Sequence, residues 1–416
     1  MLECASSDCT GHQRHVDQAL LIVIPTLHVG GAERLVEWTA PLLQNRGWRV
    51  AVMTLFDEGQ CAETLRAAQI PLLRCETGHR FYLEHNQLPR LLELAIRPGL
   101  MRGLCHDISE AMSLSDRGVL HAHCLPSQLV CRHVAGTQPA WPYIETSHLP
   151  VISPGSNWLN NSIRASLFRS WLRSVRIHIC VGAALAESLR PQLPSWLTIA
   201  IVPNGIPLPP HSDIPSTGQA EGTPSNAPSI VFVGSGKPQK NLPSLVAAFR
   251  IVAAQSPYAR LHLCGKIRPQ DLVGAGASLE AVQSLIATGQ ITLHGVIDGV
   301  GAVLRQTKVS CLVSRWEALP IAGVEMLYHG NNVVLSDIPP HREISDDGRY
   351  AWLVDPNDPE KIAQALKQAL SQPVDQGLLA ERREWIRANY SIESHVDALE
   401  KIYLDLLEGR DVECPS

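Results

Sequence analysis

The sequence predicts an α/β fold with two doubly wound parallel sheets, one in each half of the 416-residue chain. Short apolar, β-branched runs alternate with helical patterns along the whole chain. The runs are apolar on both faces, which is typical of parallel strands covered by helices on each side. A Pro-, Ser- and Gly-rich segment, residues 209–228, lies between the halves and is expected to be a flexible surface linker. The chain should therefore form two domains with a cleft between them.

Thirteen runs are predicted to be strands. In the first half they lie at 20–25, 50–55, 70–73, 119–123, 143–146, 177–181 and 199–202. In the second half they lie at 230–233, 261–264, 291–293, 309–313, 333–335 and 352–354. Ligands of such sheets bind beyond the carboxyl ends of the strands, so the two sheets should present these ends to one cleft.

Helical periodicity is clear in three places. The first helix carries one apolar stripe, formed by Ala32, Leu35, Val36, Thr39, Ala40 and Leu43. A second stripe consists of Ile362, Ala363, Leu366, Ala369 and Leu370. Two further helices are indicated near the end of the chain by Trp385, Ile386, Val396, Leu399, Ile402, Tyr403 and Leu406.

The composition excludes several classes of protein. Hydrophobic residues make up 45% and charged residues 18%, which favours full cores over intrinsic disorder. The net charge of −5 gives no electrostatic case for nucleic-acid binding. No apolar run approaches the ~20 residues of a membrane-spanning helix, and the polar residues 1–18 lack a signal-peptide pattern. The 11 scattered cysteines indicate a reduced protein, so a cytoplasmic location is expected.

The first candidate motif is the run that follows the first strand, Pro25 to Arg34. Its adjacent glycines, Gly30 and Gly31, would let the backbone turn sharply and approach a ligand beside a helix N-terminus. A tight turn without a ligand is the alternative.

The second candidate motif is Gly234-Ser235-Gly236-Lys237-Pro238-Gln239-Lys240, directly after a predicted strand. It is not a nucleotide-binding P-loop, because Pro238 follows Lys237 where Ser or Thr is required. A Gly-rich bend with two ammonium groups nevertheless suits a diphosphate. A solvated basic turn is the alternative.

The third candidate motif runs from Ser314 to Glu325. Pro320 suits the first turn of a helix, so Glu317 should lie in the loop before it and Glu325 inside the helix. Carboxylates suit the hydroxyl pairs of sugars, because each oxygen accepts a hydrogen bond. Two solvated acids are the alternative.

Together these motifs resemble the retaining glycosyltransferases of family 4, which have the two-domain GT-B fold. The signature is carried by Glu317 and Glu325 with seven residues between them. Further matches follow in family order, at Gly30-Gly31-Ala32-Glu33-Arg34, His121-Ala122-His123, Thr146-Ser147-His148, Val202-Pro203-Asn204-Gly205-Ile206, and Phe232-Val233-Gly234 through Lys240-Asn241. The resemblance covers about residues 20–408.

The resemblance implies a domain plan: a polar tail over 1–18, an acceptor-side domain over 19–208, the linker over 209–228 and a nucleotide-sugar-binding domain over 229–392. Residues 393–416 would form a C-terminal helix that crosses back to the first domain and couples hinge closure to binding.

The resemblance also implies roles for individual residues. Glu317, His123 and His148 would contact the reacting sugar. The donor would be held by Glu325 at the ribose and by Lys240 at the diphosphate. Leu319, Ile321 and Gly234 would lie at the phosphates, Gly295 and Val296 at the base, and Gly30 and Gly31 along the cleft.

One departure from the family pattern concerns the charge at the diphosphate. The family usually has Arg where this sequence has Ser235, and Lys237 is the candidate replacement. Losing one preorganised donor without replacement costs roughly 10²-fold in rate by analogy with oxyanion holes.

No metal or other cofactor is expected. The sequence offers no Asp-x-Asp pair for a divalent cation, and Lys240, Lys237 and a helix terminus can stabilise the leaving diphosphate. Because no Asp or Glu of the first domain is a clear candidate for the nucleophile, same-face attack by the acceptor is favoured over double displacement.

Two other kinds of site are alternatives in the first half of the chain. His121, His123, Cys124, Cys131 and His133 include zinc-binding residue types, but Cys131 and His133 are expected on the following helix. Residues 162–177 are Arg-rich, and read as one helix they place Arg169, Arg173 and Arg176 opposite an apolar face. Such a helix would contact an anionic membrane or pack in the core.

The sequence thus predicts a glycosyltransferase that moves a sugar from a nucleotide sugar to a glycan, lipid-linked or other hydroxyl acceptor, in polysaccharide or glycolipid synthesis. It would be cytoplasmic or peripheral at the inner face of the membrane. A nucleotide-sugar-binding protein with weakened catalysis and a nucleotide-sugar epimerase are the rival classes.

Overall fold

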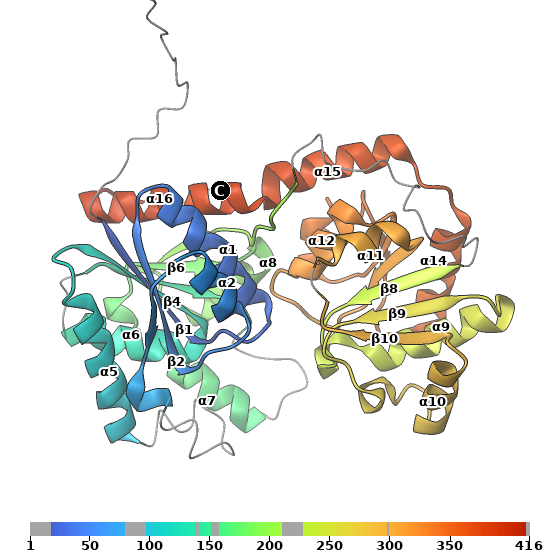
Figure 1. Cartoon of the computed structure of the whole chain (residues 1–416), viewed down its shortest axis with the longest axis horizontal. Helices are drawn as coiled ribbons and strands as arrows, with labels where there is room; N and C mark the ends of the chain where they lie inside the picture. Colours follow the sequence, from blue (N-terminus) through green and yellow to red (C-terminus); the bar gives the residue numbers. More distant parts are fainter. Residues whose placement is uncertain are drawn as a thin grey trace, which may run out of the picture.

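The computed structural model describes residues 18–79, 97–137, 141–150, 158–209, 228–297 and 299–412. The predicted linker lies almost wholly outside these residues, as does the N-terminal tail. The described residues form two α/β lobes, each built on one parallel sheet with helices on both faces (Figure 1). The predicted fold class is confirmed.

The sheet of the first lobe has seven strands in the order β3-β2-β1-β4-β5-β6-β7. They are β1 (Ala19–Thr26), β2 (Arg49–Asp57), β3 (Leu72–Arg74), β4 (Gly118–His123), β5 (Tyr143–Ser147), β6 (Ile177–Cys180) and β7 (Thr198–Ile201). All pairs are parallel, and β1 is fully buried along its length. The reversal of strand order beside β1 is that of a doubly wound sheet.

The sheet of the second lobe repeats the plan with six strands in the order β10-β9-β8-β11-β12-β13. They are β8 (Ser229–Val233), β9 (Arg260–Cys264), β10 (Ile291–Gly295), β11 (Val309–Leu312), β12 (Asn332–Ser336) and β13 (Trp352–Val354). Every strand of both sheets begins and ends within two residues of its predicted range. Continuous apolar runs locate such strands well, because both faces of each strand are buried.

The helices pack on both faces of the sheets. In the first lobe they are α1 (Gly31–Asn45), α2 (Cys61–Ala67), α5 (Pro98–Met112), α6 (Cys124–Thr137), α7 (Trp158–Phe168) and α8 (Ala183–Leu189). In the second lobe they are α9 (Leu242–Gln255), α10 (Leu279–Ala287), α11 (Gly301–Gln306), α12 (Ile321–His329), α13 (Pro339–Ile344), α14 (Pro359–Ser371) and α15 (Gln376–Tyr390). Short 3₁₀ turns lie at η1 (Leu172–Ser174), η2 (Arg190–Gln192), η4 (Pro238–Lys240) and η5 (Pro269–Leu272). The predicted apolar stripes of α1 and α14 are buried.

The last helix, α16 (Ile392–Glu408), returns to the first lobe along the top of the molecule (Figure 1). Its apolar side packs into the core of that lobe through Val396, Leu399 and Tyr403. The carboxylate of Glu400 accepts hydrogen bonds from Trp48 Nε1 at 2.8 Å and Arg46 Nη1 at 2.7 Å. These contacts place α16 on the first lobe.

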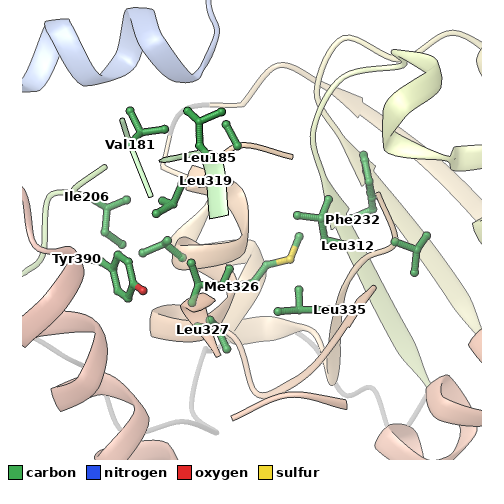
Figure 2. Close-up of a cluster of buried hydrophobic side chains, with 14 of the residues drawn as sticks. Val181, Leu185, Ile206, Phe232, Leu312, Leu319, Met326, Leu327, Leu335 and Tyr390 are labelled. Atoms are coloured by element: carbon green, nitrogen blue, oxygen red, sulfur yellow. The ribbon is translucent and has the colours of Figure 1, made fainter. Parts of the chain in front are cut away.

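The two lobes share a continuous apolar core at the hinge. Val181, Leu185 and Ile206 of the first lobe pack near Leu319 of the second lobe, with Tyr390 at the end of α15 beside them (Figure 2). Backbone hydrogen bonds join Ile206 to Tyr390 and to Ile392, each at 2.9 Å. The first lobe is therefore tied to the second at the point where the chain passes between them.

The predicted helix over residues 162–177 is wrong. α7 ends at Phe168, Trp171 adopts a left-handed conformation with φ of 51°, and η1 follows. The chain therefore forms no continuous amphipathic face here, and Trp171 is exposed instead of lying on a buried apolar side. The propensity pattern failed because the left-handed residue breaks the helical period.

Candidate active site

The candidate site is built around the bend that follows β8. Gly234 has a φ of 157°, and its N–H bonds to Cys264 O at 2.9 Å. A Cβ at the neighbouring Gly265 would lie 1.8 Å from Gly234 O, so the two backbones touch and only glycine fits at 265. Asn241, which is fully buried and left-handed with φ of 57°, then starts α9. These contacts fix the direction in which Lys240 leaves the bend.

Lys240 and Glu317 meet in this site. Lys240 Nζ lies 2.6 Å from Glu317 Oε1, and both side chains are largely buried, at 14% and 7% exposed. Gln239 Nε2 is 3.4 Å from the other carboxylate oxygen, Glu317 Oε2. The second and third sequence motifs, which are 77 residues apart, thus form one polar cluster.

The loop that carries Glu317 is held from both sides. Asn241 Nδ2 donates to Val313 O at 3.2 Å, and Arg315 N donates to Gln239 O at 2.8 Å. Ser336 Oγ donates to Ser314 O at 2.6 Å. The loop and the Lys240 bend are therefore one unit, positioned by the ends of β8, β11 and β12.

The charge state of Glu317 follows from this pairing. Burial by itself raises the pKa of the Glu317 carboxyl, but the charge and hydrogen bond of Lys240, with Ser314, bring the pKa below its ordinary value. Buried His341, which the sequence did not single out, lies close enough to interact with the same carboxylate. Glu317 is therefore ionised at neutral pH.

α12 begins one residue later than expected, because Pro320 is its N-cap and Ile321 its first residue. Leu319 is 5% exposed and belongs to the interlobe core, while Leu319 O accepts from Asn204 Nδ2 of the first lobe at 3.2 Å. The sequence placed Leu319 and Ile321 at the phosphates, and this assignment stays a prediction. The position of Leu319 also shows a role that the pattern missed, which is to bind the lobes together.

Glu325 lies one turn beyond Ile321 on α12 and faces the first lobe. Burial raises the pKa of Glu325 to about 7, and the positive charge of Arg34 on α1 opposes this rise only in part. A Cβ added at Gly31 would lie 3.7 Å from Ile321 Cδ1, so the start of α1 faces the start of α12. Glu325 therefore lies at the interface of the lobes, whereas the structure records no contact between it and Lys240.

The glycines at the start of α1 do not make a glycine-dependent turn. Gly30 has φ of −163°, an extended conformation that any residue adopts, and Gly31 is helical. A Cβ at Gly30 would meet only the flexible end of Glu33. The chain bends over residues 28–30 between β1 and α1, but the bend does not require glycine, and the glycines leave space toward the second lobe.

Ser235 and Lys237 lie on the rim of the bend. Lys237 is exposed, and no ion pair joins it to any residue of the described chain. It interacts electrostatically with Cys124, the first residue of α6 in the first lobe, so it lies near the space between the lobes. Ser235 is partly buried. An exposed positive charge is thus present two residues from the position where the family pattern has Arg.

His123 and His148 lie side by side at the ends of β4 and β5. His123 Nδ1 is 2.9 Å from His148 Nε2, and the rings stack with centroids 5.1 Å apart. Burial lowers the pKa of His148 to about 3 and that of His123 well below its usual range, so both are neutral. His148 Nδ1 is buried without a hydrogen-bond partner among the described residues.

The sequence missed His395, which lies on α16 and interacts electrostatically with His121, His123 and His148. Its Nδ1 bonds to Pro203 O at 2.7 Å, which joins α16 to the end of the first lobe. No local pattern could reveal it, because helix and strand ends meet only in the folded chain.

Gly295 and Val296 end β10 at the edge of the second sheet. Gly295 has φ of 69°, and its carbonyl oxygen accepts from Gly265 N at 2.6 Å. Val296 is 50% exposed. An exposed apolar side chain at this edge is compatible with base stacking, which stays a prediction.

The zinc alternative finds no geometry to support it. Both ring nitrogens of His121 already have hydrogen-bond partners: Nδ1 lies 2.7 Å from Tyr403 OH, and Nε2 lies 2.7 Å from Thr146 Oγ1. Cys131 and His133 lie on α6, as expected. Within the described ranges, no group of three or more His, Cys, Asp or Glu residues is arranged to hold a metal ion.

No helix of the described chain is long and apolar enough to cross a bilayer.

Family models match both halves of the chain. Residues 29–208 match the model described as Glycosyltransferase Family 4, and residues 213–391 match that described as Glycosyl transferases group 1. A curated relative, the phosphatidyl-myo-inositol mannosyltransferase of Mycolicibacterium smegmatis, is 24% identical over 230 residues. That match spans 54% of this chain and 56% of the length of the relative.

Solved structures resemble the whole described fold. The sucrose-phosphate synthase of Thermosynechococcus elongatus superposes with a TM-score of 0.74 at 18% identity, covering 94% of this chain and 100% of that one. Anabaena HepE in complex with UDP and glucose gives 0.70 at 15% identity, covering 92% and 99%. A glycosyltransferase of Rickettsia africae gives 0.71 at 15% identity, covering 95% and 100%. At these identities, the likeness shows the fold.

Proposed function

Because this chain belongs to the glycosyltransferases of the family 4 and group 1 kind, we propose that it transfers a sugar from a nucleoside-diphosphate sugar to a hydroxyl acceptor, with retention of configuration. The observation that carries the proposal is the ion pair of Lys240 with Glu317 at the carboxyl ends of β8 and β11. The experiment that tests it is an assay for a new glycoside and for released nucleotide with candidate donors.

The ion pair supports donor binding because its two charges suit the two parts of a sugar diphosphate. A diphosphate at Lys240 would share the ammonium donors, and the carboxylate of Glu317 would accept hydrogen bonds from hydroxyls of the transferred sugar. The second half of the chain is acidic overall, with 18 basic and 24 acidic side chains over residues 201–416, so these local charges must hold the anion.

In the proposed step, the bond between the anomeric carbon and the diphosphate oxygen breaks, and the electron pair stays on the diphosphate. The acceptor oxygen forms the new bond on the same face, and its proton passes to the leaving phosphate oxygen. Lys240 and Lys237 would stabilise the charge that develops there, so we propose activity without a metal ion. Glu325 would hold the ribose hydroxyls.

The acid of β5 is not available as the nucleophile of a double displacement. Glu145, on β5 near the candidate site, is fully buried and ion-paired with Arg132 and His178 at 2.6 and 2.7 Å. Such a carboxylate cannot reach an anomeric carbon without breaking this network. Among the described residues this supports same-face attack over a covalent sugar–enzyme intermediate.

His123 and His148 are proposed to contact the sugar as neutral hydrogen-bonding groups. The buried Nδ1 of His148 lacks a partner among the described residues, and an unsatisfied buried polar atom is stabilised when a ligand supplies a hydrogen bond. A sugar hydroxyl would supply it.

The donor, the base and the acceptor remain to be chosen by experiment. A neighbour was solved with UDP-glucose, and the curated relative is a mannosyltransferase named for a phosphatidyl-inositol acceptor. These names favour a screen with UDP-glucose and a nucleoside-diphosphate mannose, against glycan and lipid-linked acceptors. Saturating donor at ~100 Kd should add about 2.7 kcal/mol to the free energy of unfolding.

One observation favours a second function, that of a nucleotide-sugar-binding protein with weak catalysis. Ser235 stands where the family pattern has Arg, so the proposed diphosphate site has one fixed positive charge fewer. The product assay separates the two: a transferase releases nucleotide and forms a new glycoside of retained anomeric configuration by NMR. Donor-induced stabilisation with no product in any acceptor mixture would favour the binding protein.

A further inference from the structure

A cavity of about 770 Å³ lies in the first lobe, well away from the Lys240–Glu317 pair. Its walls are three connections that each lead from a helix into a strand: the end of α6, residues 169–174, and residues 191–196. They precede β5, β6 and β7, so the cavity lies at the amino ends of these strands. The candidate active site lies at the carboxyl ends of the strands, so the cavity and the candidate active site lie at opposite ends of the strands.

Two tryptophan rings border this cavity and remain open to solvent. Trp171 is 52% exposed and Trp196 is 56% exposed, although both are large apolar side chains. Exposed aromatic groups that line a hollow mark ligand sites more often than chance, because their apolar faces are hydrated at a cost. The apolar face of a pyranose ring packs well on an indole ring.

The backbone holds Trp171 in a costly conformation. A bulky residue in the left-handed region costs on the order of 1–3 kcal/mol and persists only where surrounding contacts impose it. Arg132 and Ser174 supply these contacts. Arg132 Nη1 donates to Phe168 O and to Ser170 O, and Ser174 Oγ donates to Trp171 O at 3.0 Å. The edge of the Trp171 ring also meets His133, with centroids 5.3 Å apart. The ring is thus preorganised at the cavity.

The charge of the cavity is positive. Arg169 and Arg173 line it and are exposed, and neither guanidinium group forms an ion pair or hydrogen bond with another described residue. No acidic side chain is among the lining residues. Guanidinium groups bind carboxylates, sulfates and phosphates in bidentate fashion, so the cavity selects an anionic ligand.

The hollow continues into a second cavity of about 690 Å³, which shares Gly136, Arg173 and Ser174 with the first. This second cavity also has Arg176, Arg410 and one acid, Asp411, on its wall, and it reaches the end of α16 at Gly409, so basic side chains outnumber the acid. The two cavities adjoin at these shared residues and together form one groove, with Arg173 on the wall of both. A chain of several units fits such a groove better than a single small molecule.

We propose that this groove binds an acidic oligosaccharide, with sugar rings stacked on Trp171 and Trp196 and acidic groups paired with Arg169 and Arg173. The inference does not depend on the donor assignment, because the groove shares no residue with the cleft. A bilayer is less suitable, since the rings face a hollow and the predicted amphipathic helix does not form.

Titration calorimetry of the full chain, without any nucleotide sugar, tests the proposal. The probes are oligogalacturonate, in which each unit carries a carboxylate, neutral maltoheptaose of similar length, and phosphatidylcholine vesicles containing phosphatidylglycerol. Trp196→Ala and Arg173→Gln should each weaken oligogalacturonate binding by about tenfold, the size typical of central interface contacts. Trp171→Gly should do the same, and glycine suits the left-handed backbone.

Matched controls are Tyr258→Ala, at an aromatic residue 75% exposed in the second lobe, and Arg102→Gln, at an exposed arginine of α5. Both should bind oligogalacturonate as the parent does. Three results would overturn the proposal: equal binding of maltoheptaose, no effect of the groove variants, or vesicle binding sensitive to Trp196→Ala without saccharide binding. The last would make the groove a membrane contact.

Discussion

The carboxylate of Glu343 in the second lobe caps the backbone of Ala183 in the first. Glu343 Oε1 accepts from Ala183 N at 2.8 Å, and the other oxygen, Oε2, accepts from Ala184 N at 3.1 Å. Burial raises the pKa of Glu343, and these hydrogen bonds lower it in part. A carboxylate at the start of α8 is favourable because it meets free N–H groups and the positive end of the helix.

Glu343→Gln should therefore destabilise the protein by about 0.5–2 kcal/mol, the usual value of a helix cap, because the amide has one acceptor oxygen and leaves one of the two N–H groups of α8 without its partner. Urea unfolding followed by circular dichroism measures the change. Glu187→Gln is the matched control, since Glu187 is exposed on α8 and its negative charge opposes ionisation of Glu343. A loss of stability in the control as large as that in Glu343→Gln would contradict the capping role.

Lys240→Met should reduce turnover by roughly 10²-fold and weaken donor binding, because it removes a preorganised positive group from the diphosphate. The variant also leaves Glu317 buried without its partner, so Lys240→Met/Glu317→Gln must be measured beside it. Lys308→Met, at an exposed lysine of the same lobe, should have no effect. Steady-state kinetics with normal turnover for Lys240→Met would show that the ion pair is structural only.

Donor affinity should rise with pH up to about 7 and then level off, because the ribose needs the ionised form of Glu325. Burial raises the pKa of Glu325 to about 7, so its acceptor form is lost as the pH falls below that value. For the same reason, ionisation of Glu325 costs folding stability as the pH rises from the unfolded pKa, near 4.5, to about 7.

Glu325→Gln should flatten the pH profile of donor binding and lower the affinity at pH 8. Calorimetric titrations at pH 5.5, 7 and 8.5 give the profile. If parent and variant show the same pH dependence, another group is responsible and the ribose assignment fails.

Ser235→Arg should strengthen donor binding if Lys237 only partly replaces the family arginine. Lys237→Ala should weaken donor binding in the parent and have a smaller effect in the Ser235→Arg background. A double-mutant cycle of donor dissociation constants measures the coupling between these two positions. Strictly additive effects would indicate that the two side chains do not serve one phosphate.

Turnover should be insensitive to EDTA, since ammonium groups take the place of a divalent cation at the leaving group. The assay is run on protein dialysed against the chelator, with and without added magnesium or manganese. Loss of activity in EDTA, restored by either metal, would refute the metal-independent step.

Much of the candidate site could be predicted because its motifs lie directly after strands. Gly234, Glu317 and His123 each follow a continuous apolar run, and the ends of parallel strands share one edge of a sheet. The resemblance to family 4 then ordered these motifs along the chain. Pairings across the chain were beyond local patterns, as the capping of Ala183 by Glu343 shows.

The sequence by itself determined the two sheets, their strands and the segments that line the cleft, because hydrophobic periodicity and strand-end residues are local properties of the chain. Only the tertiary structure decided that Lys240 pairs with Glu317, that His395 joins the histidines of the first lobe, and that Trp171 faces solvent. These outcomes depend on contacts between residues far apart in sequence, and on a left-handed residue that no helical period anticipates.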